Sequence, residues 1–220
     1  MNSDMATLPA LCRLFDGVAA ADMDGLLACI GARVVSLARG EVLFMAGTKA
    51  DRFGVVLSGA LAVVSYDAQG RRSIIKRVGP MNVAAAAQAV SRSVFGVTVE
   101  AASDSEVLVI RSERALSPCS SSCGFHIRLV RNLTTILAEK TLELNDKIGI
   151  LSHRTTADRL MAFLHVVAAS RGMREFDIPF DRQALADYLC VDRCALSTEI
   201  GKLARAGAFT VRKNHFSLSR

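Results

Sequence analysis

Three side chains near the middle of the chain are of types that bind metals or take part in redox chemistry. Cys119, Cys123 and His126 follow a Cys-x3-Cys-x2-His pattern. On a continuous helix these positions share one face, where they could hold a metal ion or form a redox switch. However, Cys-x3-Cys is an uncommon zinc spacing and no fourth ligand is evident. We therefore favour the alternative, two ordinary thiols beside a surface or capping histidine.

A second group of side chains, near the C-terminus, is suited to reading DNA. Arg193 is a natural hydrogen-bonding partner for guanine in the major groove, and the polar side chains that follow it extend the same surface. Arg182, Gln183 and the basic residues further along the chain are suited to backbone phosphates. The predicted DNA-binding residues are Arg182, Gln183, Arg193, Cys194, Ser197, Thr198, Lys202, Arg212 and Lys213.

The elements that would position these side chains can be predicted from caps and spacing. Asp181 and Asp192 each precede a short amphipathic stretch and can cap a helix, one ending at Leu189 and the other running past Ile200. Cys190 and Val191 form the turn between the two helices, and a small residue, Ala186, stands where crossing helices must approach closely. The alternating residues 209–218 form a hairpin. This pattern predicts a helix-turn-helix followed by a wing.

Residues 34–110 have a different pattern, in which short stretches of β-forming residues recur between glycines. They predict a β-sandwich or a barrel-like roll interrupted by one helical segment, 84–88. The turn Asp67–Gly70 joins two of the strands. The predicted strands are 34–37, 41–44, 54–57, 61–66, 73–78, 97–101 and 107–110.

A long amphipathic helix is predicted at residues 126–151. Its narrow apolar stripe is typical of a coiled-coil seam, so we interpret it as a dimer interface. The alternative is a helix that packs on the β-rich N-terminal part of its own chain. The predicted interface residues are Ile127, Val130, Leu133, Leu137, Leu144 and Ile148.

Composition limits the class of protein. The chain has 220 residues, of which 51% are hydrophobic and 22% charged, as expected of a folded globular protein. The net charge is +6, and residues 151–220 hold 11 basic and 7 acidic side chains, which favours a polyanionic partner for that end. Apolar runs are too short for a membrane span and no secretory signal is recognisable, so we expect a cytoplasmic protein without a membrane partner.

The chain as a whole resembles the Crp/Fnr family of transcription regulators. The resemblance is carried by Gly40–Gly47, Val55–Leu61, Arg182–Leu189 and Val191–Arg193. It implies an α+β chain with three parts: an N-terminal β-roll (a double-stranded β-helix or jelly roll) that senses an effector, a long dimerisation helix and a C-terminal winged helix-turn-helix. We place these parts at residues 1–125, 126–151 and 152–220.

The effector site departs from the pattern of the family's cyclic-nucleotide-binding members. These carry a Gly-Glu pair and an Arg followed by Ser or Thr, which together hold ribose and phosphate. Ala84 and Ala85 stand at the first pair of positions, and Phe95 and Gly96 at the second. Arg92 is close but out of register. The isolated Cys12 and Cys29 do not match the cysteine cluster of the iron–sulfur members. We therefore expect an effector other than cyclic AMP, with haem or another small molecule as candidates.

The sequence thus predicts a homodimeric, sequence-specific DNA-binding regulator that is not an enzyme. Its expected partners are a palindromic double-stranded operator and, as a further candidate, RNA polymerase. The alternative is a cyclic-nucleotide-binding regulatory module that acts on a protein partner. The helix-turn-helix favours the first interpretation, and the altered phosphate site disfavours the second.

Overall fold

The structure is a computed structural model that describes residues 8–70, 72–117 and 124–219. The chain divides into two compact units, Met1–Glu139 and Lys140–Arg220. Within the described residues, no helix is both long enough and apolar enough to cross a membrane.

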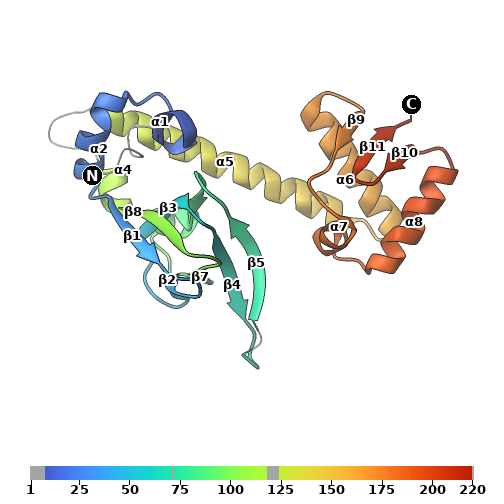
Figure 1. The fold of residues 1–220 in the computed structure, drawn as a ribbon, viewed down its shortest axis with the longest axis horizontal. Helices are drawn as coiled ribbons and strands as arrows, with labels where there is room; N and C mark the ends of the chain where they lie inside the picture. The colour runs from blue at the N-terminus through green and yellow to red at the C-terminus, as the bar shows by residue number, and fades with distance from the viewer. Residues whose placement is uncertain (1–7, 71, 118–123, 220) are drawn as a thin grey trace. The chain divides into compact units, whose positions relative to one another are not determined.

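The first unit is built around two antiparallel sheets that form a roll (Figure 1). One sheet has the strand order β1-β8-β3-β6 and the other has the order β2-β7-β4-β5. Apolar side chains from both sheets meet between them and form one core cluster. The strands are β1 (Arg33–Leu37), β2 (Val42–Phe44), β3 (Arg52–Ser58), β4 (Leu61–Tyr66), β5 (Arg72–Val78), β6 (Val83–Ala84), β7 (Thr98–Ala101) and β8 (Ser105–Arg111).

The strands predicted from the sequence are confirmed, and so is the turn between β4 and β5, where Gly70 has a φ of 76°. The predicted helical segment begins later than expected. Val83 and Ala84 pair with Val55 and Gly54 of β3, so they extend a sheet. The helix α3 therefore runs from Ala86 to Ser91.

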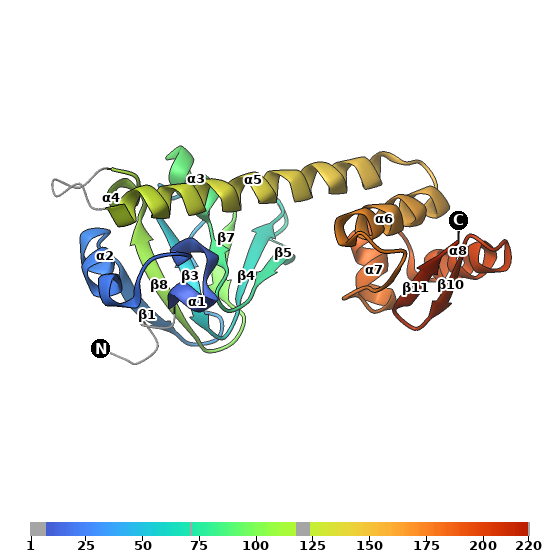
Figure 2. The same cartoon turned by 90° about the horizontal axis from the view of Figure 1, so that it is seen from above.

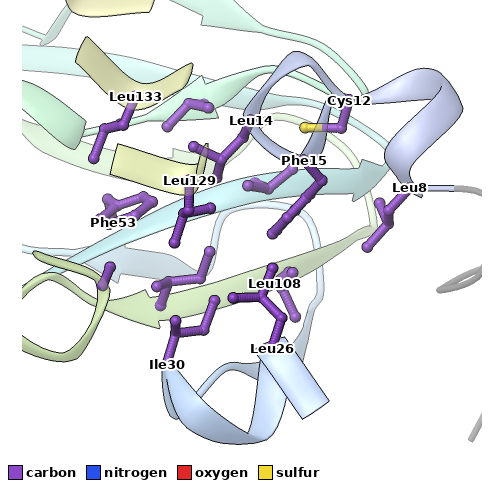
Figure 3. Packing of buried hydrophobic residues seen from close by; sticks show 14 of the residues in the cluster. Leu8, Cys12, Leu14, Phe15, Leu26, Ile30, Phe53, Leu108, Leu129 and Leu133 are labelled. Atoms are coloured by element: carbon purple, nitrogen blue, oxygen red, sulfur yellow. The ribbon is translucent and has the colours of Figure 1, made fainter. Parts of the chain in front are cut away.

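Helices pack against the outer face of β3 and β8 (Figure 2). They are α1 (Leu8–Leu11), α2 (Met23–Cys29), α4 (Ser112–Leu116) and the start of α5 (Gly124–Ser152), with 3-10 turns at Arg13–Phe15 and Ala20–Asp22. Figure 3 shows Leu129 and Leu133 of α5 beside Phe53 and Leu108 of the sheet. This core fixes the first turns of the long helix to the roll.

The predicted long helix is confirmed as α5, but its apolar stripe is divided between two roles. Leu133 is 2% exposed and belongs to the core of its own unit, which corrects its assignment to a dimer interface. By contrast, Ile127, Leu144 and Ile148 are 75%, 62% and 65% exposed. The alternative interpretation, a helix that packs on its own unit, is therefore confirmed for Leu133, whereas the dimer interface stays a prediction for the exposed residues.

The second unit combines three helices with a small antiparallel sheet of order β10-β11-β9 (Figure 1). Thr155 caps its first helix by accepting a hydrogen bond from the Asp158 N–H (3.1 Å), and Gly172 ends it in the left-handed region, as predicted. The elements are α6 (Thr156–Arg171), β9 (Glu175–Asp177), α7 (Arg182–Leu189), α8 (Arg193–Arg205), β10 (Phe209–Arg212) and β11 (His215–Leu218).

Candidate nucleic-acid interface

The helices α7 and α8 begin at the two aspartates that the sequence singles out. Asp181 Oδ1 accepts a hydrogen bond from the Ala184 N–H (2.8 Å), and Asp192 Oδ1 accepts one from the Ala195 N–H (2.9 Å). Each cap satisfies a donor that the first helical turn leaves without a partner and stabilises the helix by about 1 kcal/mol. Because the caps fix where each helix starts, they also fix which side chains of α8 lie in its first turn.

The turn between the helices is short and tightly packed. Cys190 ends α7 with φ 53° and ψ 51°, in the left-handed region that reverses the chain direction. Ala186 is fully buried, in the same core as Leu185 of α7 and Leu196 of α8. A larger side chain at position 186 would force α7 and α8 apart. The predicted helix-turn-helix geometry is therefore confirmed.

One face of α8 is anchored in the core, and its first turns also present polar side chains to solvent. Leu196 and Ile200 are buried, whereas Arg193, Cys194, Ser197 and Thr198 are exposed. The Ser197 hydroxyl donates to the Arg193 carbonyl (2.9 Å), and the Thr198 hydroxyl donates to the Cys194 carbonyl (3.0 Å). These bonds hold both side chains close to the helix and leave the exposed face unobstructed.

The basic side chains predicted to contact DNA differ in their surroundings. Lys202 forms an ion pair with Glu199 (2.7 Å), and Gln183 donates to Asp187 (2.9 Å). Arg193, Arg212 and Lys213 have no side-chain hydrogen bond or ion pair with any residue that the structure describes. These three cations are therefore available to an external anion.

The wing is the hairpin of β10 and β11, and its tip is fastened to the segment that precedes α7. Arg212 pairs with His215 at the end of the hairpin, and Lys213 has a φ of 56°. The Ile178 N–H donates to the Asn214 carbonyl (2.9 Å), and the Asn214 side-chain amide donates to the Ile178 carbonyl (3.1 Å). One tip residue, Asn214, is thus held from outside the hairpin through both its backbone carbonyl and its side-chain amide.

Arg182 adds a third connection to the wing. Its Nη2 donates to the Lys213 carbonyl (2.9 Å), and its guanidinium lies 5.6 Å from the centre of the Phe216 ring. Burial lowers the pKa of Arg182 below its ordinary value. The predicted phosphate ligand Arg182 therefore has a contact within the protein that its position in the sequence does not predict. An open groove of about 500 Å³ adjoins this contact, lined by Ile178, Pro179, Phe180, Asp181, Arg182, Lys213 and Asn214.

A histidine near the wing tip lies between two carboxylates. His215 Nε2 is 3.0 Å from Glu175 Oε1, and its Nδ1 is 3.1 Å from Asp177 Oδ1. Hydrogen bonds, first to Glu175 and then to Asp177, raise the pKa of His215 above its ordinary value. Protonation of His215 therefore strengthens the link between β9 and β11.

The positions predicted to line an effector pocket are apolar or turned to solvent. Ala84 is 2% exposed, Ala85 precedes α3 with a φ of 63°, and Arg92 ends α3 as an exposed residue with a φ of 53°. Phe95 is 3% exposed, and its ring stacks on that of Phe44 with the ring centres 4.9 Å apart. At the position where a phosphate would need a cation, the roll thus has a buried aromatic pair.

The predicted cysteine and histidine group lies only partly within the described residues. Cys119 and Cys123 fall outside them, so only His126 can be placed. It is 5% exposed, near the start of α5, and its ring contacts the Arg114 carbonyl and the Cys29 thiol. The described residues contain no grouping of three or more His, Cys, Asp or Glu side chains that could hold a metal ion.

Comparison with known proteins identifies the fold. Residues 34–121 match the model of the cyclic nucleotide-binding domain family. A comparison with curated protein sequences gave no match. Three similar solved structures are each less than 25% identical to this chain.

The regulator CLP of Xanthomonas campestris is 17% identical, with a TM-score of 0.58 over 91% of this chain and 99% of that one. The catabolite activator protein of Thermus thermophilus is 18% identical, with a TM-score of 0.53 over 94% and 93%. FixK2 of Bradyrhizobium japonicum is 20% identical, with a TM-score of 0.51 over 86% and 93%. Residues 34–121 are therefore similar to the cyclic nucleotide-binding domain family, and the chain has the fold that these three solved structures share.

Proposed function

We propose that the protein is a homodimeric transcription regulator that binds a specific DNA sequence. The observation that carries the proposal is the exposed first turn of α8, which is fixed by the Asp192 cap and begins with Arg193. A capped helix of this kind presents its N-terminal side chains to base edges in the major groove. The structurally similar CLP is a global regulator that links signalling to virulence gene expression, which agrees with this function.

The DNA contacts are divided between base reading and phosphate binding. Arg193, Cys194, Ser197 and Thr198 face the bases. The phosphate backbone of the DNA is contacted by Gln183, Lys202, Arg212 and Lys213. Arg182 supports the wing and lies near the same DNA strand. Arg212 and Lys213 at the wing tip support this division most directly, because both are exposed and neither has an ion-pair partner among the described residues, whereas Lys202 would have to exchange Glu199 for a phosphate.

The uncovered part of α5 supports a second copy of the chain as the partner in the dimer. Leu144 and Ile148 lie one turn apart and both are exposed, as an apolar seam requires before it meets its partner. A dimer with a two-fold axis would place two α8 helices in successive major grooves, so the operator would be palindromic with half-sites roughly 34–36 Å apart. RNA polymerase is a further candidate partner of the DNA-bound dimer.

In this proposal the effector that controls DNA affinity is a molecule other than cyclic AMP. The roll does not suit cyclic AMP, because Ala84 and Ala85 offer no side chain that could bind its phosphate, and Phe95 is buried against Phe44. Burying a phosphate charge with neither a cation nor hydrogen-bond donors is strongly unfavourable. For the same reason we do not favour a nucleotide-binding module acting on a protein partner, and the proposal includes no enzymatic activity.

Duplex selection from a random library, followed by binding measurements over a range of salt concentrations, tests this function. Arg193→Ala is expected to cost roughly 1–3 kcal/mol on the selected site and to relax the preference at one base pair. Arg212→Ala is expected to weaken binding to all duplexes and to lower the salt slope by about 1. The matched control is Arg205→Ala at the other end of α8, about 18 Å from Arg193 along the helix, which should change neither. A chain that stays monomeric and retains no duplex at low salt would refute the proposal.

A further inference from the structure

A buried histidine near the start of α5 is held in a defined tautomer by the backbone. His126 is 5% exposed, and its Nε2 lies 2.9 Å from the carbonyl oxygen of Arg114 in α4. A carbonyl oxygen can only accept, so Nε2 must carry the hydrogen. In the neutral ring, Nδ1 is then the basic nitrogen with a lone pair.

That basic nitrogen faces a thiol. Cys29, the last residue of α2, is half-buried, and its Sγ lies 3.9 Å from His126 Nδ1. The two residues are far apart in sequence and meet because α2 and α5 pack on the same face of the roll. A sulfur nucleophile, a base beside it and a third group that orients the base are the three parts of an activated thiol.

We propose that Cys29 and His126 form a reactive thiol–imidazole pair whose substrate is a hydroperoxide. His126 Nδ1 takes the proton of the Cys29 thiol, and the resulting thiolate attacks one peroxide oxygen. The O–O bond breaks, the terminal OH is transferred to Cys29 as a sulfenic acid, and the leaving alkoxide (hydroxide when the substrate is hydrogen peroxide) takes the proton back from the imidazolium as an alcohol or as water. The sulfur is oxidised by two electrons and the peroxide is reduced by two, so the step is balanced.

The other cysteines in the described residues lack this arrangement. Cys12 is buried, and burial raises the pKa of its thiol, which disfavours the thiolate. Cys190 and Cys194 are exposed but have no imidazole within hydrogen-bonding distance among the residues that the structure describes. The pair is less suited to binding a metal ion, because among the residues that the structure describes no third His, Cys, Asp or Glu joins it to form a metal site.

The pair predicts that Cys29 reacts faster with peroxide than Cys190 and Cys194. Solvent exposure alone would predict the opposite order. The full-length protein is treated with hydrogen peroxide, sulfenic acid is trapped with dimedone, and each cysteine is followed separately by peptide mass spectrometry. Cys29 is expected to react at least about tenfold faster than Cys190 and Cys194, although both of these are more exposed. A Cys29 rate equal to or below theirs would overturn the proposal, and this comparison needs no variant.

A substitution of His126 then shows whether the reactivity of Cys29 comes from its activation by the imidazole or from its access to solvent. His126→Gln can still donate to the Arg114 carbonyl but cannot take a proton, so the Cys29 rate should fall by at least about tenfold while the rates at Cys190 and Cys194 stay unchanged. Circular dichroism establishes that the variant is folded. An unchanged Cys29 rate in the folded variant would also overturn the proposal. Neither measurement involves DNA, so the result is independent of the regulatory function.

Discussion

Removing the guanidinium of Arg182 tests whether this residue supports the wing or contacts phosphate. Arg182→Met keeps most of the aliphatic side chain but deletes the hydrogen bond to the Lys213 carbonyl and the cation above Phe216. The wing tip would then keep the two hydrogen bonds between Ile178 and Asn214 and the strand pairing of the hairpin.

The expected loss of stability follows from these two contacts. A hydrogen bond from a charged donor contributes about 1.5–3 kcal/mol when buried, but Arg182 is only half-buried, so we expect about 1 kcal/mol from it. The cation–π contact adds about 0.5–1 kcal/mol. Together they predict that Arg182→Met lowers the free energy of unfolding of the winged unit by about 1–2 kcal/mol. In a domain of this size each kcal/mol lowers Tm by roughly 4–8 °C.

Thermal unfolding combined with the salt dependence of duplex binding distinguishes the two roles. The matched control is Arg212→Met, because Arg212 is exposed on the same hairpin without a described partner. The control should leave stability within about 0.5 kcal/mol of wild type and lower the salt slope by about 1. If Arg182→Met instead leaves Tm unchanged and lowers the slope as the control does, Arg182 is a phosphate ligand and our reasoning about the wing is wrong.

Three other properties can be measured directly. Leu144→Glu should raise the dissociation constant of the dimer at least about tenfold in sedimentation equilibrium, because it places a charge in the proposed seam, whereas Asn145→Glu on the same turn should not. His215 is stabilised in its charged form by Glu175 and Asp177, so its contribution to stability is full below the ordinary pKa of 6.5 and is lost as the pH rises through the raised value. The stability of wild type relative to His215→Gln should therefore be greater at pH 5.5 than at pH 8.5, and an equal difference at both would contradict this. Calorimetric titration with cyclic AMP or cyclic GMP should show no saturable binding. Micromolar affinity coupled to tighter DNA binding would refute our inference that the roll lacks a working phosphate site.

The parts of the fold that the sequence predicts well are those governed by local rules. Asp181 and Asp192 were identified because a helix cap needs one side chain and the three residues after it. Strand positions were likewise readable from short apolar stretches bounded by turns. The beginning of α3 was misplaced, because Val83 and Ala84 have helical neighbours in sequence but pair with β3, which lies far away in the chain. Non-local pairing overrode local propensity there.

The contacts that sequence spacing could not predict join residues that are far apart in the chain. The spacing of Cys119, Cys123 and His126 placed them on one helical face, yet the described sulfur partner of His126 is Cys29, brought to it by the packing of α2 against α5. Likewise, the pattern of α5 could not separate Leu133, which is buried in the core of its unit, from Leu144, which is exposed, because both lie on the same apolar stripe. Periodicity identifies the face of a helix that is apolar, but only the tertiary contacts determine which part of it remains for a partner. For that reason the exposed Leu144 and Ile148, and not the whole stripe, are where a dimer interface should be tested first.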